Sequence, residues 1–389
     1  MPLIFLLRSV FSLLSWFLLG WAVYLLWTYY AGIEAVAPDG TIRLIHEDIR
    51  LWGGLALLAW SVGIGGLLVR AVLGKSGGRP FKPVRGSGRQ LPLANGDKIY
   101  VETAGNLAGP TIIFTHGWGL DSTIWQYAKE DFSDYRLVFW DLPGLGQSAA
   151  SRPVTLERLA EALAAVIAWA GPAPYALVGH SIGGMTIQTL VRSNPAALRL
   201  ARGIVLINTT YTNPLRTMIL PGLMAALEGP ILRPAMALTK WLLPLSWLSA
   251  WQSYLSGSAH LATRLGFGSH VTKAQLEATT LIQTRNSPGV QADGNIAMFN
   301  WDATGAMAAF DAPLLVLGGS VDIVTKPDAS VAIAETAPAA SLEIAAQAGH
   351  MGFLESSEQY HAPLRRFLER ALVAAPDQGP VLTERLPGV

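Results

Sequence analysis

Cysteine is absent from this chain of 389 residues, and charged residues make up only 14% of it. The lack of cysteine excludes thiolate zinc sites, iron–sulfur clusters, disulfides and cysteine nucleophiles. The charged fraction is well below the roughly 25% that is usual in soluble domains. The net charge is +1, and no basic run is interleaved with aromatic residues. We therefore expect no nucleic-acid partner.

The scarcity of charge is concentrated near the N-terminus. Residues 9–31 and 51–69 contain no Asp, Glu, Lys, Arg or His. Because about 20 apolar residues cross the hydrocarbon core as a helix, the sequence predicts two transmembrane helices, at about 9–31 and 51–70. A cleaved signal peptide is the alternative for the first run. Its length and the lack of a clear small-residue cleavage site favour a retained span.

Basic residues determine the expected orientation. The loop between the two runs holds two arginines against four acidic residues, whereas six basic residues follow the second run: Arg70, Lys75, Arg79, Lys82, Arg85 and Arg89. The positive-inside rule places this flank and both termini in the cytoplasm. We expect an integral protein of a bacterial-type inner membrane, with membrane lipid as a partner and the main domain on the cytoplasmic side. Residues 76–90, rich in glycine and basic residues, are predicted to form a flexible linker.

From Leu91 onward, short apolar runs alternate with helical patterns. Strands are predicted at 98–105, 111–115, 136–141, 175–180, 203–208, 313–320 and 341–346, and helices at 155–170, 181–195 and 356–375. This alternation predicts a mainly parallel sheet with helices on both faces. Ligands in such folds bind beyond the carboxyl ends of the strands.

One strand-to-helix junction carries an exposed serine. The stretch "ALVGHSIGGMTIQTL" places Ser181 in a Gly-X-Ser-X-Gly pattern between Gly179 and Gly183. This pattern is typical of a nucleophile elbow, a strained turn in which the flanking glycines avoid clashes with the neighbouring strand and helix. The hydroxyl then lies at a helix N-terminus, which favours developing negative charge.

Further motifs in the same chain order complete a resemblance. "HGWG", "DLPGLGQS", "GHSIGG", "GGSVDIV" and "GHMGFLE" resemble the motifs of the α/β-hydrolase superfamily, and the resemblance covers about 91–372. It implies an α/β-hydrolase fold with an eight-stranded, mainly parallel sheet and a helical cap after strand 6. "HGWGL" with a downstream tryptophan is similar to small carboxylesterases such as the pimeloyl-carrier-protein methyl ester esterases.

The uncharged runs and the resemblance together imply a division of the chain. The two predicted transmembrane helices occupy 1–75, the hydrolase core 91–210 and 301–375, the cap 211–300, and a C-terminal tail 376–389. The cap sequence is apolar, helical and interrupted by proline. Such a cap covers the nucleophile and shapes an apolar pocket, and part of it could rest on the membrane.

The expected catalytic residues are Ser181, Asp322 and His350. Ser181 attacks an acyl carbonyl, His350 transfers its proton, and Asp322 orients the imidazole. The backbone N–H groups of Trp118 and Ile182 are the expected oxyanion hole. Competing acids at Asp302, Asp311 and Asp328 fit the chain order less well, because none lies just past the strand at 313–320. No metal or cofactor is expected.

These features predict a membrane-anchored serine hydrolase that cleaves a small-molecule or lipid-like carboxylic ester with an apolar acyl part. Thioesterase, acyltransferase and other α/β-hydrolase chemistries remain alternatives, because the same triad serves them. A further alternative is a catalytically silent binding or scaffold protein bound to the membrane.

Overall fold

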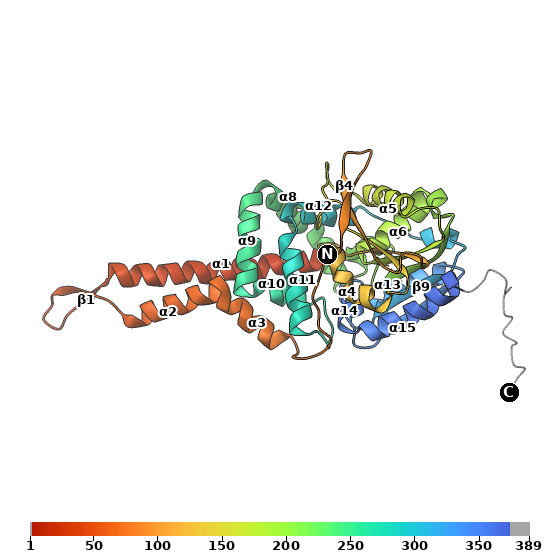
Figure 1. Ribbon diagram of the computed structural model, residues 1–389. Helices are drawn as coiled ribbons and strands as arrows, with labels where there is room; N and C mark the ends of the chain where they lie inside the picture. Colours follow the sequence, from red (N-terminus) through yellow and green to blue (C-terminus); the bar gives the residue numbers. More distant parts are fainter. Residues whose placement is uncertain (1, 374–389) are drawn as a thin grey trace, which may run out of the picture.

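A computed structural model describes residues 2–373 of the chain and shows three regions side by side (Figure 1). An α/β core lies at one end, a layer of cap helices lies beside it, and a pair of N-terminal helices protrudes from the cap. The predicted tail at 376–389 lies outside the described residues.

The core is built on one eight-stranded sheet with the order β10-β9-β8-β7-β5-β6-β4-β3. The strands are β3 (Gly88–Pro92), β4 (Lys98–Gly105), β5 (Thr111–Thr115), β6 (Arg136–Trp140), β7 (Tyr175–His180), β8 (Ala201–Ile207), β9 (Leu314–Gly319) and β10 (Ala340–Ala345). β4 runs antiparallel to β6 and β3, and the other pairs are parallel. The predicted mainly parallel eight-stranded fold is confirmed. β3 begins inside the range predicted as linker.

Helices cover both faces of the sheet because successive strand residues point to opposite sides. Leu177 of β7 packs in the cluster that contains α5 (Leu156–Ala170), α6 (Ile182–Ser193) and α13 (Pro327–Thr336). Its neighbour Val178 packs in the cluster that contains α4 (Gln126–Asp131) and α15 (Ser357–Leu368). The short α14 (Gly352–Glu355) precedes α15.

Six helices form the cap between β8 and β9, the sixth and seventh strands of the sheet. They are α7 (Pro221–Leu227), α8 (Arg233–Trp241), α9 (Leu243–Ser256), α10 (Ser258–Arg264), α11 (Lys273–Arg285) and α12 (Pro288–Phe299). The cap has its own small core, in which Met224, Met236 and Phe299 are buried. Phe5 and Leu6 of the N-terminal helix pack against that core. The cap is therefore assembled partly from the first residues of the chain.

The N-terminal region is a helical hairpin. α1 (Pro2–Ala31) is followed by a small antiparallel ribbon of β1 (Ile33–Val36) and β2 (Ile42–Ile45), which the sequence patterns did not predict. α2 (Asp48–Ala59) returns along α1, and α3 (Gly65–Leu73) contacts α9, α10 and α11 (Figure 1). Helical segments Ile4–Ala31 and Asp48–Leu73 have the length and apolar composition needed to cross a membrane.

The second apolar run is not one straight helix. A π-helical turn at Trp60–Ile64 joins α2 to α3, and Gly63 within it has φ 156°, outside the helical region. Beyond this break, a Cβ on Gly65 would come within 2.4 Å of the Ser256 carbonyl oxygen. Glycine therefore lets α3 approach the end of α9 closely, and the chain leaves the axis of α2 to do so.

Glu277 of α11 joins three elements in a group that we call the anchor clasp. Its carboxylate pairs with Arg70 of α3 at 3.0 Å and with His260 of α10 at 2.8 Å, and it accepts a hydrogen bond from Tyr254 of α9. Burial alone would raise the pKa of Glu277, but the hydrogen bonds from these three side chains outweigh it and lower the pKa to about 2. The clasp ties the N-terminal hairpin to the cap.

The segment predicted as a flexible linker is fixed to the core. Arg85 pairs with Asp141 at 2.7 Å and with Asp121 at 2.9 Å. Phe81 is buried, and Arg79 pairs with Asp131 at 2.7 Å. Arg79 and Arg85, two of the basic residues that follow the second apolar run, thus hold the segment after the hairpin against the core.

Helix α9 has an inverted polarity. Its buried face carries Gln252, Ser253 and Ser256, whereas its exposed apolar residues recur at helical spacing: Leu245, Leu248, Trp251 and Leu255. On the inner face, the hydroxyl oxygens of Ser249 and Ser12 of α1 are 2.6 Å apart. The Gln252 amide donates to the hydroxyl of Ser15 at 2.7 Å. α1 and α9 therefore meet through hydroxyl and amide groups.

Candidate active site

Ser181 occupies the sharp turn between β7 and α6. Its backbone has φ 54° and ψ −121°, a left-handed strained conformation for a residue with a side chain. A Cβ on Gly179 would lie 2.7 Å from the main chain of Gly183, and one on Gly183 would lie 2.4 Å from the Thr115 carbonyl oxygen. Glycine at both positions therefore lets strand, turn and helix pack this closely.

The structure brings together the three side chains predicted from separate segments. His350 Nε2 lies 3.0 Å from Ser181 Oγ, and His350 Nδ1 lies 2.8 Å from Asp322 Oδ2. All three residues are buried, with 5% of Ser181 exposed. Since Nδ1 faces a carboxylate, it carries the proton and leaves Nε2 free to accept one from the serine.

Asp322 is held by more groups than the sequence indicated. The backbone N–H groups of Val324 and Thr325 donate to Oδ1 at 2.7 and 3.0 Å. The Thr325 hydroxyl and the Asn208 amide donate to Oδ2 at 2.8 and 2.9 Å. Burial alone would raise the pKa of Asp322, but the His350 imidazole and these hydrogen bonds keep it below its usual range. The carboxylate is thus ionised and fixed beside His350.

Asn208 and Thr325 are positioning residues that the motifs missed. Asn208 follows β8, has φ 43°, and donates a second hydrogen bond from Nδ2 to the Gly349 carbonyl at 3.2 Å. It therefore links the Asp322 loop to the His350 loop. The available signal was its place at the carboxyl end of a parallel strand, where sites form.

The predicted oxyanion turn lies over the start of α6. Gly117 is so close to His180 that a Cβ would come within 2.5 Å of Nδ1, and the turn closes with a hydrogen bond from Leu120 N–H to the Gly117 carbonyl. Trp118 follows in this turn, and Ile182 opens α6, where the first N–H groups have no partner within the helix.

Two other histidines in this region are structural. The Nε2 of His116 accepts the Leu142 N–H at 3.0 Å, and His180 Nε2 donates to the His350 carbonyl at 3.0 Å. Burial lowers the pKa of His116, and it lowers the pKa of His180 well below the usual value. Both rings therefore stay neutral and place no competing cation beside His350.

Among the described residues, no group of three or more His, Cys, Asp or Glu side chains is arranged to hold a metal ion. What the site does combine is a hydroxyl, an imidazole and a carboxylate in hydrogen-bonding order. That arrangement can activate the hydroxyl as a nucleophile.

Comparisons with known proteins point to one family. The Alpha/beta hydrolase family matches residues 112–362. The pimeloyl-(acyl-carrier protein) methyl ester esterase of Nitrosomonas europaea is 26% identical over 271 residues, which cover 67% of this chain and 96% of that protein. The protein of the same name from Aeromonas hydrophila is 36% identical over 93 residues, 23% of this chain and 35% of that protein.

Solved structures share the fold. A thermophilic esterase from Thermogutta terrifontis superposes with a TM-score of 0.60 at 20% identity, covering 74% of this chain and 100% of that chain. A bromoperoxidase from Bacillus anthracis gives a TM-score of 0.59 at 17% identity, covering 73% of this chain and 100% of the other. At these identities the likeness concerns architecture alone. The N-terminal hairpin precedes the first residue of the family match.

Proposed function

The chain belongs to the α/β-hydrolase family, and from that premise we propose that it is a membrane-anchored serine esterase acting on apolar acyl esters. The observation that carries the proposal is the continuous hydrogen-bonded series from Ser181 through His350 to Asp322. Relatives named as methyl ester esterases support a carboxylic ester as the bond that is cleaved.

The geometry fits a two-step acyl transfer. Ser181 Oγ attacks the ester carbonyl carbon while His350 Nε2 takes the hydroxyl proton. The carbonyl oxygen gains negative charge beside the N–H groups assigned to Trp118 and Ile182. The tetrahedral intermediate collapses, and His350 gives the proton to the departing alcohol. Water then cleaves the acyl-serine by the same steps, with His350 again as the base, and releases the acid.

Membrane anchoring is supported by the length and apolar composition of the helical segments Ile4–Ala31 and Asp48–Leu73. The contacts of α1 with α9 extend to Trp16, whose Nε1 donates to Ser249 at 3.1 Å. The remaining residues of α1, 17–31, span about 22 Å as a helix, which is shorter than the roughly 30 Å hydrocarbon core. We infer that the bilayer also takes in the exposed apolar face of α9. An apolar outer face and a polar inner face are what a lipid environment favours.

Labelling with a fluorophosphonate probe tests the assignment of the nucleophile. The detergent-purified protein should be labelled, and Ser181→Ala and His350→Ala should abolish labelling and ester turnover. Ser193→Ala, at the exposed end of the same helix, is the matched control and should label like wild type. Loss of activity without loss of fold in the first two variants supports the proposal. Unchanged ester turnover in Ser181→Ala would refute it, and a folded wild type that neither labels nor cleaves esters would favour a binding protein.

A further inference from the structure

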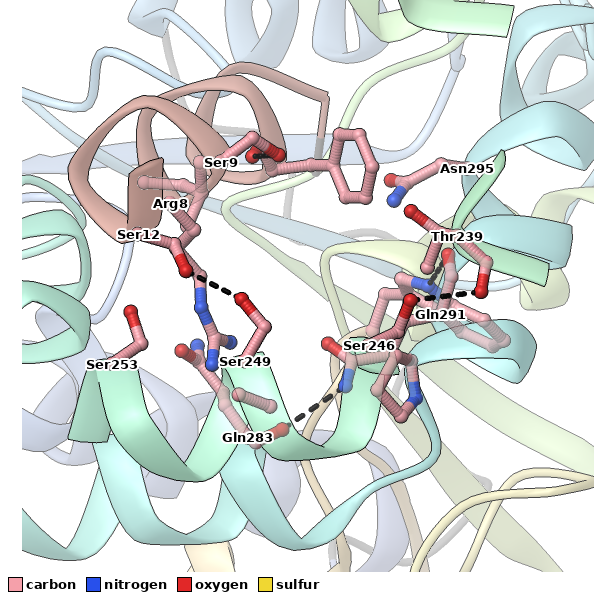
Figure 2. Close-up of a pocket in the computed structure, with 15 residues that line it drawn as sticks. Arg8, Ser9, Ser12, Thr239, Ser246, Ser249, Ser253, Gln283, Gln291 and Asn295 are labelled. Carbon is pink, nitrogen blue, oxygen red and sulfur yellow. Dashed lines mark hydrogen bonds between the residues drawn. The ribbon is translucent and has the colours of Figure 1, made fainter. Parts of the chain in front are cut away.

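A pocket lies where the first turns of α1 meet the cap (Figure 2). It encloses about 870 Å³ between the surrounding atoms, part of it open to solvent. Its walls come from α1, α8, α9, α11 and α12, and Trp118 of the predicted oxyanion turn also lines it. The first turns of α1 therefore form part of the wall of a pocket that Trp118 also lines.

Arg8 is the single charged side chain among the residues that line this pocket. Within residues 2–373, no carboxylate lies within ion-pair distance of its guanidinium and no acceptor hydrogen-bonds to it. Figure 2 shows the guanidinium directed from α1 toward the side of the pocket that carries Ser249, Ser253 and Gln283. A partly buried arginine without a counter-charge is unfavourable unless a ligand supplies one.

The rest of the lining fits a molecule with one charged end. Ile4, Phe5 and Pro288 provide apolar surface. Across the pocket from Arg8 lies Gln291, whose carbonyl accepts a hydrogen bond from the Trp118 indole at 3.0 Å. Hence the cation lies on one side of the pocket and the oxyanion turn lies on the other. The planar guanidinium matches a carboxylate or phosphate with paired hydrogen bonds.

We propose that this pocket binds an ester that carries an anionic group, a carboxylate or a phosphate, and that Arg8 is its counter-ion. The inference rests on the proposed esterase function and names its substrate class. It also makes α1 part of the substrate site. The anion has two sources, a soluble acid ester or the headgroup of an anionic lipid. If Arg8 only helped to set the orientation of the chain in the membrane, its replacement would not change the preference between charged and uncharged esters.

The test compares two soluble esters of equal acyl length, 4-nitrophenyl octanoate and 4-nitrophenyl hydrogen suberate. We expect wild type to favour the suberate, and Arg8→Gln to lower kcat/KM for the suberate by about 10- to 100-fold, as loss of a charge-assisted pair implies. The octanoate should be unaffected. Arg8→Lys should retain part of the preference because it keeps the charge without the paired geometry. Arg50→Gln, at the far end of the hairpin, is the matched control and should change neither rate.

A second arm identifies the source of the anion. Fatty-acid release is measured from vesicles of phosphatidylglycerol and of phosphatidylcholine. A preference for phosphatidylglycerol that is lost in Arg8→Gln indicates that the anion is a lipid headgroup. A preference for the suberate alone that is lost in Arg8→Gln indicates a soluble acid. Either result supports the proposal that Arg8 binds the anionic group of the substrate. Equal effects of Arg8→Gln on charged and uncharged esters, or none, would overturn it while leaving the esterase intact. Failure of wild type to cleave any of these esters would instead reject the proposed function.

Discussion

Helices α5 and α9 are similar in length but opposite in polarity. α5 lies on the sheet and buries Leu159, Leu163 and Val166, and it exposes Glu157 and Glu161. This is the pattern of a helix on a water-soluble core, in which the apolar stripe faces inward.

In α9 the polar side chains face inward and the apolar ones outward. Gln252 and Ser253 are buried, whereas Leu245 and Leu248 are 57% and 53% exposed. In water such a helix would gain nothing from its apolar face. In lipid, where the hydrophobic effect does not drive helices together, small and hydrogen-bonding side chains hold them instead. The comparison shows two helices of one chain with opposite polarity: the pattern of α5 suits a helix packed on a core in water, and the pattern of α9 is the one that lipid favours.

The largest expected effect is a loss of catalysis that leaves the N-terminal hairpin and α9 unchanged. Asp322→Asn should lower kcat by about 10⁴-fold, because the amide stabilises the wrong imidazole tautomer. Soluble and vesicle-borne esters should lose the same factor, as measured by initial rates. Asp302→Asn, at the competing acid near the cap, should leave both rates close to wild type. A reversed pattern would move the acid role to Asp302.

Two acidic substitutions on the exposed face of α9 test whether this face contacts lipid. Leu245→Glu/Leu248→Glu should lower activity on vesicle-borne ester by about threefold to tenfold, since a charge near the bilayer interface costs up to about 1 kcal/mol. Soluble ester should be hydrolysed as before. Val331→Glu on α13, an exposed apolar site of the core, is the control. Equal effects on both substrates would show that α9 faces water.

Removing the charge of Glu277 tests how strongly the anchor clasp stabilises the contact between the N-terminal hairpin and the cap. Glu277→Gln should lower the free energy of unfolding by about 1–3 kcal/mol at pH 7, through loss of the charged hydrogen bonds of the anchor clasp. The pKa of Glu277 is about 2 in the folded protein and about 4.3 in an unfolded chain. Its contribution is therefore full above pH of about 4.3 and lost as pH falls toward 2.

Thermal unfolding of wild type and Glu277→Gln at several pH values measures this difference. The gap between the two should be constant from pH 7 to 5 and close at lower pH. A gap that is as large at pH 2 as at pH 7 would mean that the side chain acts through shape and not through charge.

The smallest effect compares a single hydrogen bond of α5 with one between α1 and α9. The Thr155 hydroxyl caps α5 by accepting the Arg158 N–H at 3.3 Å, and Thr155→Ala should cost about 1 kcal/mol. Ser12→Ala removes the bond to Ser249 and should cost about 0.6 kcal/mol. A double-mutant cycle of Ser12→Ala and Ser249→Ala isolates that term in unfolding titrations. A coupling near zero would contradict a structural role for this contact.

Local patterns predicted the core well. The run 111–115 was assigned as a strand with the bounds that β5 has, because a short β-branched run between turn residues has few other solutions. The helix predicted at 155–170 is present as α5, Leu156–Ala170. Ser181, His350 and Asp322 were found from motifs, and the structure brings them together.

Features that depend on distant partners escaped the same reasoning. Asn208 forms its contacts with residues more than a hundred positions away, and nothing beside it in sequence marks that role. Arg8 meets the cap only after the hairpin has folded back on it. The break at Gly63 was also missed, since an unbroken apolar run carries no sign of the cap against which α3 turns.

If the protein is anchored as proposed, the length of residues 17–31 of α1, about 22 Å, has a further consequence when bilayers differ in thickness. The hydrocarbon core of a thin bilayer matches the length of this part of α1. A thicker bilayer must either be compressed locally or take in more of α9. Hydrophobic mismatch of this kind costs fractions of a kcal/mol per Å. In that arrangement the depth of the pocket mouth in the bilayer would depend on the acyl-chain length of the surrounding lipid. In the proposed membrane-anchored protein, the composition of the bilayer would then regulate substrate entry without a dedicated ligand.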